Sequence, residues 1–407
     1  MKRGHVSPAI EVHATRERPL GMPPARFLRD YWQKHPLLIR GGFPIFGKAI
    51  AAEDLAGLAC EEAALARIVT RKKPRKELDS RLRRNDEHFV LRNGPFAEKD
   101  FANLPKTHWT LLVQDVDKWD MDVAALLDEF AFIPSWRVDD VMVSYATDGG
   151  GVGAHVDHYD VFLVQGIGRR RWRIDARPNP AVDFRDDVEL KLLREFAPTH
   201  DWILEPGDAL YLPPGVPHEG TAIGECTTIS IGMRAPSQAE LLLDFSEFLA
   251  EPLGEERRFS DPDLRPARAA GEIDAAALAR VCAALPHFSN VDNSTLLRWF
   301  GAFITRYRSG HSAIPAARPL TAAQLAAKLP RARLLRNPFS RFAWARHGRG
   351  ALLFVAGENH ACSVALAQAL CAHREYAGAA LARIGTHAHA TLAALVNAGH
   401  LQLIRSP

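Results

Sequence analysis

Cysteine is scarce in this chain of 407 residues, and a long hydrophobic run is missing. Its five cysteines are odd in number, scattered, and never spaced as a C-x-x-C pair. This argues against both a disulfide framework and a zinc site made of cysteines. No apolar run approaches the roughly 18–20 residues that a membrane-spanning helix needs, and the charged N-terminal segment lacks a secretion signal. We therefore expect a protein of the reducing cytoplasm.

A large excess of charge of one sign is also missing. Lys and Arg number 51 against 48 Asp and Glu, a formal net charge of +3, so the whole molecule is not built to coat a polyanion. Two segments that are rich in basic residues stand out, residues 67–84 and the arginines between Arg331 and Arg349. Each segment is either a solvated surface stretch or a contact for RNA, and the sequence leaves both interpretations open.

The middle of the chain is rich in β-type residues. Short runs that alternate with Gly, Pro and Asp turns are found at residues 109–113, 138–145, 161–165, 169–174, 209–212 and 227–232. This spacing predicts an all-β barrel or jelly roll rather than βαβ units. Upstream, the residues FLRDYWQKHPLLIRGGF predict a helix, a strand at 37–40 and a Gly-Gly turn.

Beyond Pro236 the pattern becomes helical. Ser237 and Glu240 form a capping box ahead of an apolar helix, and a second apolar face runs from Leu296 to Tyr307. Helices this apolar must pack on the barrel, on each other or on a second subunit, so we expect a homodimer. After a Pro-rich linker, small helices at 321–329, 364–373 and 389–398 flank a strand-like run at 351–356, which predicts a winged-helix-like module.

A metal site is indicated by the text GGGVGAHVDHYD. His155 and Asp157 stand two residues apart, which in a strand places both side chains on one face. His218, after a Pro-Pro-Gly turn, is the candidate third ligand. Two histidines and one carboxylate leave half of an ion's coordination sphere open, as Fe(II) oxygenases require for a co-substrate and O₂. The alternative is a set of polar residues at the rim of the barrel. His158 has the opposite parity and is expected to face outward.

The chain resembles the JmjC-type, cupin-fold oxygenases that depend on Fe(II) and 2-oxoglutarate, and more narrowly the bacterial ribosomal protein arginine 3-hydroxylases. The resemblance rests on GGGVGAHVDHYDVFLVQGIGRRRWRI, LEPGDALYLPPGVPHEG, SIGMRAP and FSDPD. It implies a mainly β chain with added α-helices, built around a double-stranded β-helix core. The implied divisions are an N-terminal extension that packs on the barrel, the JmjC core, a helical dimerisation segment, a linker and a winged-helix-like domain, at residues 1–105, 106–236, 237–308, 309–320 and 321–407.

Strand parity predicts the rest of the pocket. Arg170 shares a face with Trp172 and Ile174, so it points inward, and a buried guanidinium needs an anion. The resemblance makes that anion the distal carboxylate of 2-oxoglutarate, with Ser144 as a second contact. An internal salt bridge to a barrel carboxylate is the alternative.

The same argument aims Asp140, Tyr159 and Ser230 at the cavity, Tyr159 by continuing the series His155, Asp157. The resemblance implies that these three hold the substrate side chain, and a carboxylate with hydroxyls suits a desolvated guanidinium. Structural hydrogen bonding is the alternative for each residue.

Three functions therefore remain in view. The resemblance implies hydroxylation of an arginine in a large-subunit ribosomal protein, with ribosomal RNA contacted through the basic segments. The same chemistry on a histidyl or methylated residue, or on a small molecule, is the first alternative. A non-enzymatic metal-binding cupin whose winged helix binds DNA is the second, and a complete ligand set with an inward Arg170 argues against it.

Overall fold

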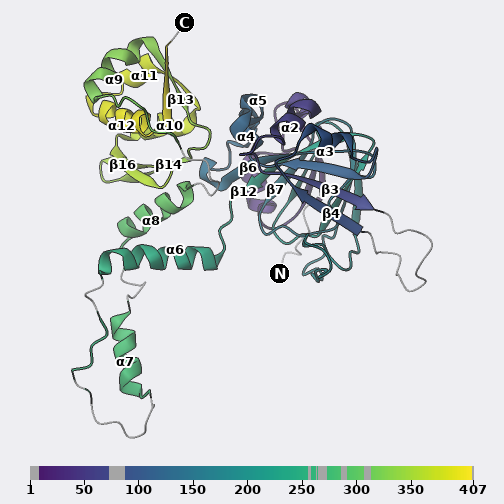
Figure 1. Cartoon of the computed structure of the whole chain (residues 1–407), viewed down its shortest axis with the longest axis horizontal. Coiled ribbons are helices and arrows are strands. Elements are labelled where there is room, and N and C mark those ends of the chain that lie inside the picture. The colour runs from purple at the N-terminus through teal and green to yellow at the C-terminus, as the bar shows by residue number, and fades with distance from the viewer. Residues whose placement is uncertain are drawn as a thin grey trace, which may run out of the picture. The chain divides into compact units, whose positions relative to one another are not determined.

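A computed structural model describes residues 9–72, 88–254, 258–262, 264, 273–285, 291–306 and 313–405. The chain divides into two compact units, Met1–Ala235 and Pro236–Pro407 (Figure 1). Among the described helices, none combines the length and the apolar character needed to cross a membrane.

The first unit is built from two β-sheets. Its strands are β1 (Glu11–His13), β2 (Leu37–Arg40), β3 (Ala66–Lys72), β4 (His88–Asn93), β5 (Trp109–Val113), β6 (Val138–Ala146), β7 (Val161–Gln165), β8 (Arg169–Ile174), β9 (His200–Leu204), β10 (Ala209–Leu212), β11 (His218–Ile223) and β12 (Cys226–Met233). The larger sheet has the order β1-β2-β10-β7-β12-β6-β5-β3-β4, and the smaller β11-β8-β9. Among the strands that the structure describes, β1 and β2 are the one pair that runs in parallel. This is the predicted jelly-roll core, and each of the six predicted β runs is a strand.

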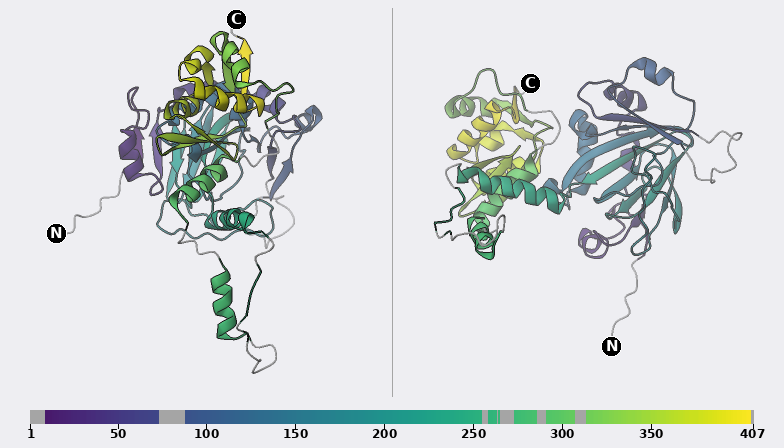
Figure 2. Two further views of the ribbon diagram at one scale, coloured as in Figure 1. Left: turned by 90° about the vertical axis from the view of Figure 1, so that its left-hand side faces the viewer. Right: turned by 60° about the horizontal axis from the view of Figure 1, so that its bottom comes forward.

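The two faces of the larger sheet have different partners. One face carries apolar residues such as Val143, Phe162 and Ile229, which pack with helices α1 (Pro24–Asp30), α2 (Ala52–Leu58), α4 (Val116–Trp119) and α5 (Met121–Ala125) in the main core. Those helices lie on the outer side of the strands in the barrel (Figures 1 and 2). The neighbouring residues in sequence, such as Ser144 and Ser230, line a cavity instead. Alternation along the strands thus separates the core from the cavity.

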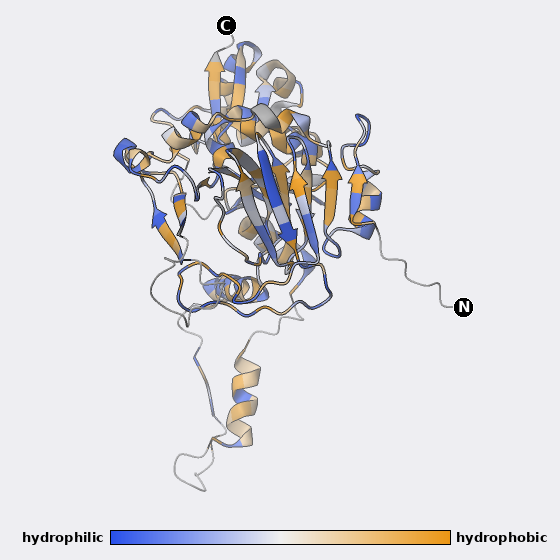
Figure 3. Cartoon of the chain, turned by 90° about the vertical axis from the view of Figure 1, so that its right-hand side faces the viewer, coloured by the Kyte–Doolittle hydropathy of each residue, from blue (hydrophilic) through white to orange (hydrophobic). Residues whose placement is uncertain are grey.

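The smaller sheet packs on the cavity face of the larger one. Trp172, Ile174 and Leu204 form one cluster with Leu163 and Leu212 of the larger sheet. In Figure 3 the strands of this unit carry both hydrophobic and hydrophilic residues. The cavity therefore lies in a packed, two-layered barrel.

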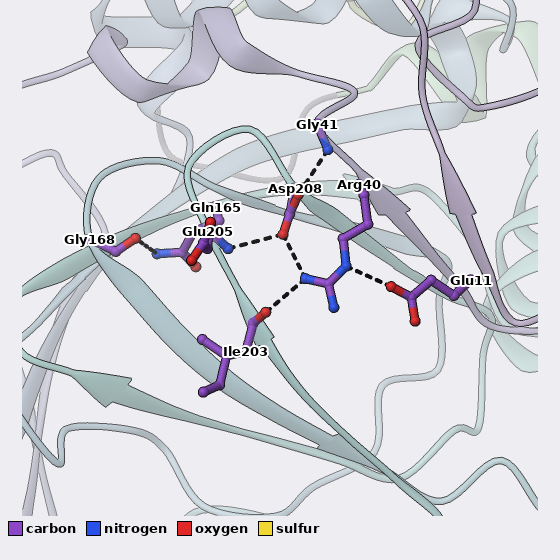
Figure 4. Close-up of polar contacts among 8 residues, drawn as sticks. All are labelled: Glu11, Arg40, Gly41, Gln165, Gly168, Ile203, Glu205 and Asp208. Atoms are coloured by element: carbon purple, nitrogen blue, oxygen red, sulfur yellow. Dashed lines mark hydrogen bonds and ion pairs between the residues drawn. The ribbon is translucent and has the colours of Figure 1, made fainter.

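Asp208, the last residue of the Pro-Gly-Asp sequence at 206–208, links the two sheets through hydrogen bonds (Figure 4). Its carboxylate accepts hydrogen bonds from Arg40 Nη1 and from the Gly41 amide, both at 2.8 Å. Arg40 also donates to Glu11 Oε1 and to the carbonyl of Ile203, each at 2.8 Å. These hydrogen bonds join β1, β2 and β9 to the turn before β10. They thereby hold β10, the strand that leads to His218, in place.

A second buried carboxylate, Asp160, anchors the loop that follows the predicted metal ligands. It is fully buried and accepts hydrogen bonds from Tyr211 Oη at 2.6 Å, Gln33 Nε2 at 2.9 Å and Arg137 Nη2 at 3.3 Å. Asp160 stands two residues after His158, so the two repeat the spacing of His155 and Asp157, and the structure gives Asp160 this anchoring position.

Removal of the Asp160 carboxylate should strongly destabilise the barrel. The Asp160→Ala variant leaves the buried Tyr211 hydroxyl without its acceptor and the partly buried Arg137 guanidinium without its carboxylate, so we expect the free energy of unfolding to fall by about 3–5 kcal/mol. Urea unfolding would measure this, with Asp183→Ala, an exposed carboxylate, as the control. A loss below about 1 kcal/mol would contradict the anchoring role.

The second unit combines helices with two small sheets. Its elements are α6 (Gln238–Ala250), α7 (Ala275–Ala284), α8 (Asn293–Thr305), α9 (Ala322–Lys328), η6 (Leu329–Arg331), β13 (Ala332–Arg336), β14 (Phe342–His347), β15 (Gly350–Val355), β16 (Glu358–Cys362), α10 (Val364–Ala372), β17 (Glu375–Ala377), α11 (Gly378–Ala382), α12 (Thr386–Asn397) and β18 (Leu401–Arg405). The sheets have the orders β17-β13-β18 and β14-β15-β16. The capping box at Ser237 is present. Tyr307 and residues 309–312 of the predicted linker lie outside the described residues.

The sequence analysis missed several strands. In the barrel these are β1, β3, β4, β9 and β11, and in the second unit β13, β14, β16, β17 and β18. Most carry charged or small residues, so their hydrophobic pattern is weak. β3 and β4 also flank the basic run, most of which (residues 73–87) lies outside the described residues.

Candidate active site

A cavity of about 480 Å³ lies between the two sheets, within the usual range for small-molecule sites. All eight predicted site residues line it: His155, Asp157, His218, Arg170, Ser144, Asp140, Tyr159 and Ser230. The structure thus brings together residues from four strands (β6, β8, β11 and β12) and one loop.

Three potential metal ligands meet at one end of this cavity. The ligand atoms of His155, Asp157 and His218 all lie within 4.8 Å of one another. His218 Nε2 is 3.6 Å from an Asp157 carboxylate oxygen, and the two imidazole centroids are 4.2 Å apart. This group is the sole cluster of three or more His, Cys, Asp or Glu with metal-binding geometry that was found in the described parts of the chain.

Both imidazoles are oriented by the backbone. Nδ1 of His155 lies 2.9 Å from the carbonyl of Gly153, and Nδ1 of His218 lies 2.9 Å from the carbonyl of Val216. Each Nδ1–H therefore donates to a carbonyl, which leaves Nε2 as the free lone pair, as metal-ligating histidines commonly require. Burial, and then the nearby His155, lower the pKa of His218 to about 4, so its imidazole is neutral at physiological pH.

The prediction that His155 and Asp157 share a strand is wrong. Residues 147–160 form no regular strand, and His155 makes only isolated bridges, to His218 and to Leu192. Two backbone hydrogen bonds of 3.0 Å join His155 and His218 directly. The parity argument therefore does not apply to Asp157 or to Tyr159, although both residues line the cavity.

Glycine makes this loop possible. A Cβ on Gly151 would lie 2.3 Å from the carbonyl oxygen of Gly220, and Gly153 has a φ of +84°, which other residues rarely adopt. The loop can therefore cross β11 at backbone distance and carry His155 to His218. His158, expected to face outward, is exposed at the mouth of the cavity.

Arg170 is a buried cation at the other end of the cavity. It is 5% exposed, and its neighbours Arg169 and Arg171 face solvent, as strand parity predicts. Its Nη1 donates to Thr228 Oγ1 at 3.0 Å and to Ser144 Oγ at 3.2 Å, while its buried Nε has no partner. Burial lowers the pKa of Arg170. The alternative of an internal salt bridge fails, because Arg170 pairs with no carboxylate among the described residues.

An anionic ligand would complete this end of the cavity. The desolvation of Arg170 is compensated here only by neutral hydroxyls, and a buried guanidinium is costly without an anion. Thr228 shares strand parity with Ser230 and is therefore expected on the same polar face, but the sequence analysis gave it no role in the site. The sequence analysis also missed Arg67, which lines the cavity from the unpredicted strand β3.

Asp140, Tyr159 and Ser230 line the same cavity. Burial, followed by Asp115 and Asp139, raises the pKa of Asp140 to about 7. Burial also raises the pKa of Tyr159, and the nearby Asp157 and Asp140 add to this effect. Tyr159 is nevertheless 41% exposed, whereas Ser230 is buried. The cavity therefore contains a carboxyl group, that of Asp140, whose ionised form a neighbouring positive charge would stabilise.

Comparisons with known proteins agree with this architecture. Residues 125–241 match the JmjC domain family and residues 288–402 the ROXA-like winged helix family. The chain is 36% identical over 290 residues to the ribosomal protein uL16 3-hydroxylase of Escherichia coli, covering 69% of this chain and 71% of that protein. It is 37% identical over 247 residues to a probable ribosomal oxygenase of Haemophilus influenzae, covering 60% of this chain and 56% of that protein.

Solved structures give the same result along most of the chain. The structure of YcfD, a ribosomal oxygenase from Escherichia coli, in complex with cobalt and 2-oxoglutarate, matches with a TM-score of 0.76 at 31% identity. The match covers 94% of this chain and 99% of that one. The predicted fold class, with its JmjC core and winged-helix domain, is therefore confirmed, and the chain belongs to the ribosomal oxygenase family of JmjC enzymes, which use Fe(II) and 2-oxoglutarate.

Proposed function

We propose that His155, Asp157 and His218 hold the Fe(II) and that Arg170 and Ser144 hold the distal carboxylate of 2-oxoglutarate. The observation that carries this proposal is the convergence of three ligand atoms within 4.8 Å, with both Nδ1 atoms hydrogen-bonded to carbonyls. Bound iron supplies the activation of O₂ that hydroxylation of an unactivated C–H bond needs. The chain's own task is to orient the co-substrate and to shield the reaction from water.

We propose further that the substrate is an arginine side chain of a large-subunit ribosomal protein, hydroxylated at C3. The relative from Escherichia coli is named for 3-hydroxylation of uL16, which makes uL16 the first candidate. In the cavity, the Asp140 carboxylate would pair with the guanidinium, while Tyr159 and Ser230 would offer hydroxyls to its remaining N–H groups. A histidyl substrate would make less use of Asp140.

Intact-mass comparison of ribosomal proteins tests this proposal. Large-subunit proteins from cells with and without the gene should differ by one oxygen in a single protein, and fragmentation should place it on an arginine. Incubation of the purified enzyme with that protein from the deletion strain should restore the oxygen. A gain on histidine, or no difference in any ribosomal protein, would contradict the arginine assignment.

The pH dependence should report on Asp140. Because arginine stays charged, only the ionised carboxylate attracts it, so kcat/KM for an arginyl peptide should rise with pH, reach half of its plateau near pH 7 and level off about one unit higher. The Asp140→Asn variant should have a lower kcat/KM with this rise removed. A wild-type profile that is flat between about pH 6 and 8, or an unchanged profile in the variant, would contradict the role of Asp140.

Dimer formation through residues 237–308 is also part of the proposal. None of the residues of helices α6 and α7 is buried, and Leu243 and Leu278 are 72% and 56% exposed. Figure 3 shows α7 as hydrophobic along most of its length. Such apolar exposure favours a second subunit as its partner, which sedimentation of the full chain would test.

We place the enzyme in the cytoplasm because its proposed substrate is a ribosomal protein. We also propose contact with ribosomal RNA through the two basic segments. The first segment lies mostly outside the described residues, so its support is the sequence charge alone. The proposed division of the chain retains the boundaries 1–105, 106–236, 237–308, 309–320 and 321–407.

A further inference from the structure

The winged-helix module has a charge balance very different from that of the whole chain. Residues 313–405 contain eleven of the 51 basic residues and only two of the 48 acidic ones, Glu358 and Glu375. The module therefore has a formal charge of +9, whereas the remaining residues together have −6. The near-neutral total conceals this separation. An excess of this size opposes folding through self-repulsion unless a partner meets it.

Most of this charge is not neutralised within the module. Six basic side chains are exposed and have no hydrogen-bond or ion-pair partner in the portion of the chain that the structure describes. They are Arg318, Lys328, Arg331, Arg346, Arg349 and Arg383. Of the two carboxylates, Glu375 pairs with Arg333 at 2.9 Å, and Glu358 lies 3.9 Å from His360.

Five of these six cations form two groups on defined elements. Arg346 lies near the end of β14 and Arg349 in the turn between β14 and β15, where His347 pairs with Gly350. Lys328, Arg331 and Arg383 lie at the ends of α9, η6 and α11, and a Cβ on Gly378 would be 2.2 Å from the carbonyl oxygen of Leu329, so η6 and α11 are in backbone contact. We call these the wing pair and the corner triad.

The helices of the module, in contrast, carry almost no positive charge. Neither α10 nor α12 contains an arginine or lysine, and α9 contains only Lys328, in its last turn. The commonest specific contact of a helix with base edges in a DNA major groove is made by such side chains. The charge therefore lies where it can track a phosphate backbone rather than where it could read a sequence.

We propose that this module is a docking surface for RNA, bound through its phosphates by the wing pair and the corner triad. Ten of the eleven basic residues are arginines, which suit bidentate phosphate contacts better than lysines do. The distribution over turns and helix ends fits recognition of an irregular backbone, as in folded RNA. This inference rests on the ribosomal RNA contact proposed above for the second basic segment, and it assigns that contact to two defined groups of side chains. It is separate from the oxygenase site and does not depend on iron or 2-oxoglutarate.

Fluorescence anisotropy with the full chain tests the proposal. The probe is a fluorescein-labelled RNA hairpin of mixed sequence, titrated between about 50 and 200 mM KCl, with a DNA duplex and polyglutamate as competitors. The Arg346→Gln/Arg349→Gln variant should weaken binding about tenfold at 100 mM KCl and should lower the slope of log K against log salt by roughly 1.4–1.8. The corner variant, Lys328→Gln/Arg331→Gln/Arg383→Gln, should lower this slope further than the wing variant does.

A matched control separates local contact from net charge. The Arg171→Gln/Arg177→Gln variant removes the same charge as the wing variant, but from ion-paired residues of the first unit, and it should bind RNA as the wild type does. Equal losses in both variants, no RNA binding at 50 mM KCl, or tighter binding of the DNA duplex or of polyglutamate would overturn the proposal. Succinate formation with a free peptide should be unchanged in the wing variant, so failure here is distinct from failure of the oxygenase assignment.

Discussion

Replacement of Asp157 by alanine should nearly abolish the conversion of 2-oxoglutarate to succinate. Loss of a group that only orients a metal ligand commonly costs 10–100-fold, so loss of a ligand itself should exceed about 100-fold. In the structure, Asp157 supplies the one carboxylate among the three converging ligands. Succinate formation with saturating Fe(II) and 2-oxoglutarate is the measurement.

An exposed aspartate provides the control for this variant. Asp183 is 71% exposed and pairs with Arg194 at 3.0 Å on the surface of the same unit. Asp183→Ala should keep wild-type turnover. If Asp157→Ala turned over at a normal rate, the three residues could not be the iron site, and the assignment would have to move elsewhere in the cavity.

Replacement of Arg170 by alanine should raise the KM for 2-oxoglutarate by about 100-fold. A guanidinium that binds a carboxylate through two charge-assisted bonds contributes about 3 kcal/mol, which corresponds to that factor. The affinity for Fe(II) should change little, because Arg170 contacts the hydroxyls of Ser144 and Thr228 and none of the three proposed ligands. Initial rates at varied 2-oxoglutarate and at varied iron would separate the two effects.

The adjacent arginine is a matched control for Arg170. Arg171 is exposed and pairs with Asp201 across the same small sheet, so Arg171→Ala should leave both requirements unchanged. Ligand-induced stabilisation gives an independent test. At one hundred times its Kd, 2-oxoglutarate should stabilise the wild type by about 2.7 kcal/mol, but at the same concentration it should stabilise Arg170→Ala by only about 0.4 kcal/mol. Equal stabilisation of both proteins would contradict the role of Arg170.

The sequence predicted the barrel well because its interior strands are strongly apolar. Strands β7, β10 and β12 are buried at every position, and nearly all of their residues are apolar or small. Arg170 was placed correctly because β8 alternates regularly between exposed and buried residues. Strands such as β11, which begins at His218 and continues HEGTAI, have no such pattern.

Loop geometry could not be predicted in the same way. His155 and Asp157 converge on His218 because a glycine-rich loop crosses β11 and bonds to it through the backbone. Strand periodicity has no bearing on a segment of this kind, so the convergence of these residues in the cavity was predicted through a mistaken intermediate step. The anchoring role of Asp160 depends on contacts with Gln33 and Tyr211, which are distant in sequence. No local pattern contains such information.

The most direct test is anaerobic titration of the metal-free protein with Fe(II), with and without 2-oxoglutarate, followed by visible absorption. A half-open iron site should bind one Fe(II) per chain and should develop a charge-transfer band only when 2-oxoglutarate chelates the metal. The band should be lost in Asp157→Ala and should require much more 2-oxoglutarate in Arg170→Ala. Iron that binds without any response to 2-oxoglutarate, or an unchanged band in Asp157→Ala, would contradict the assignment.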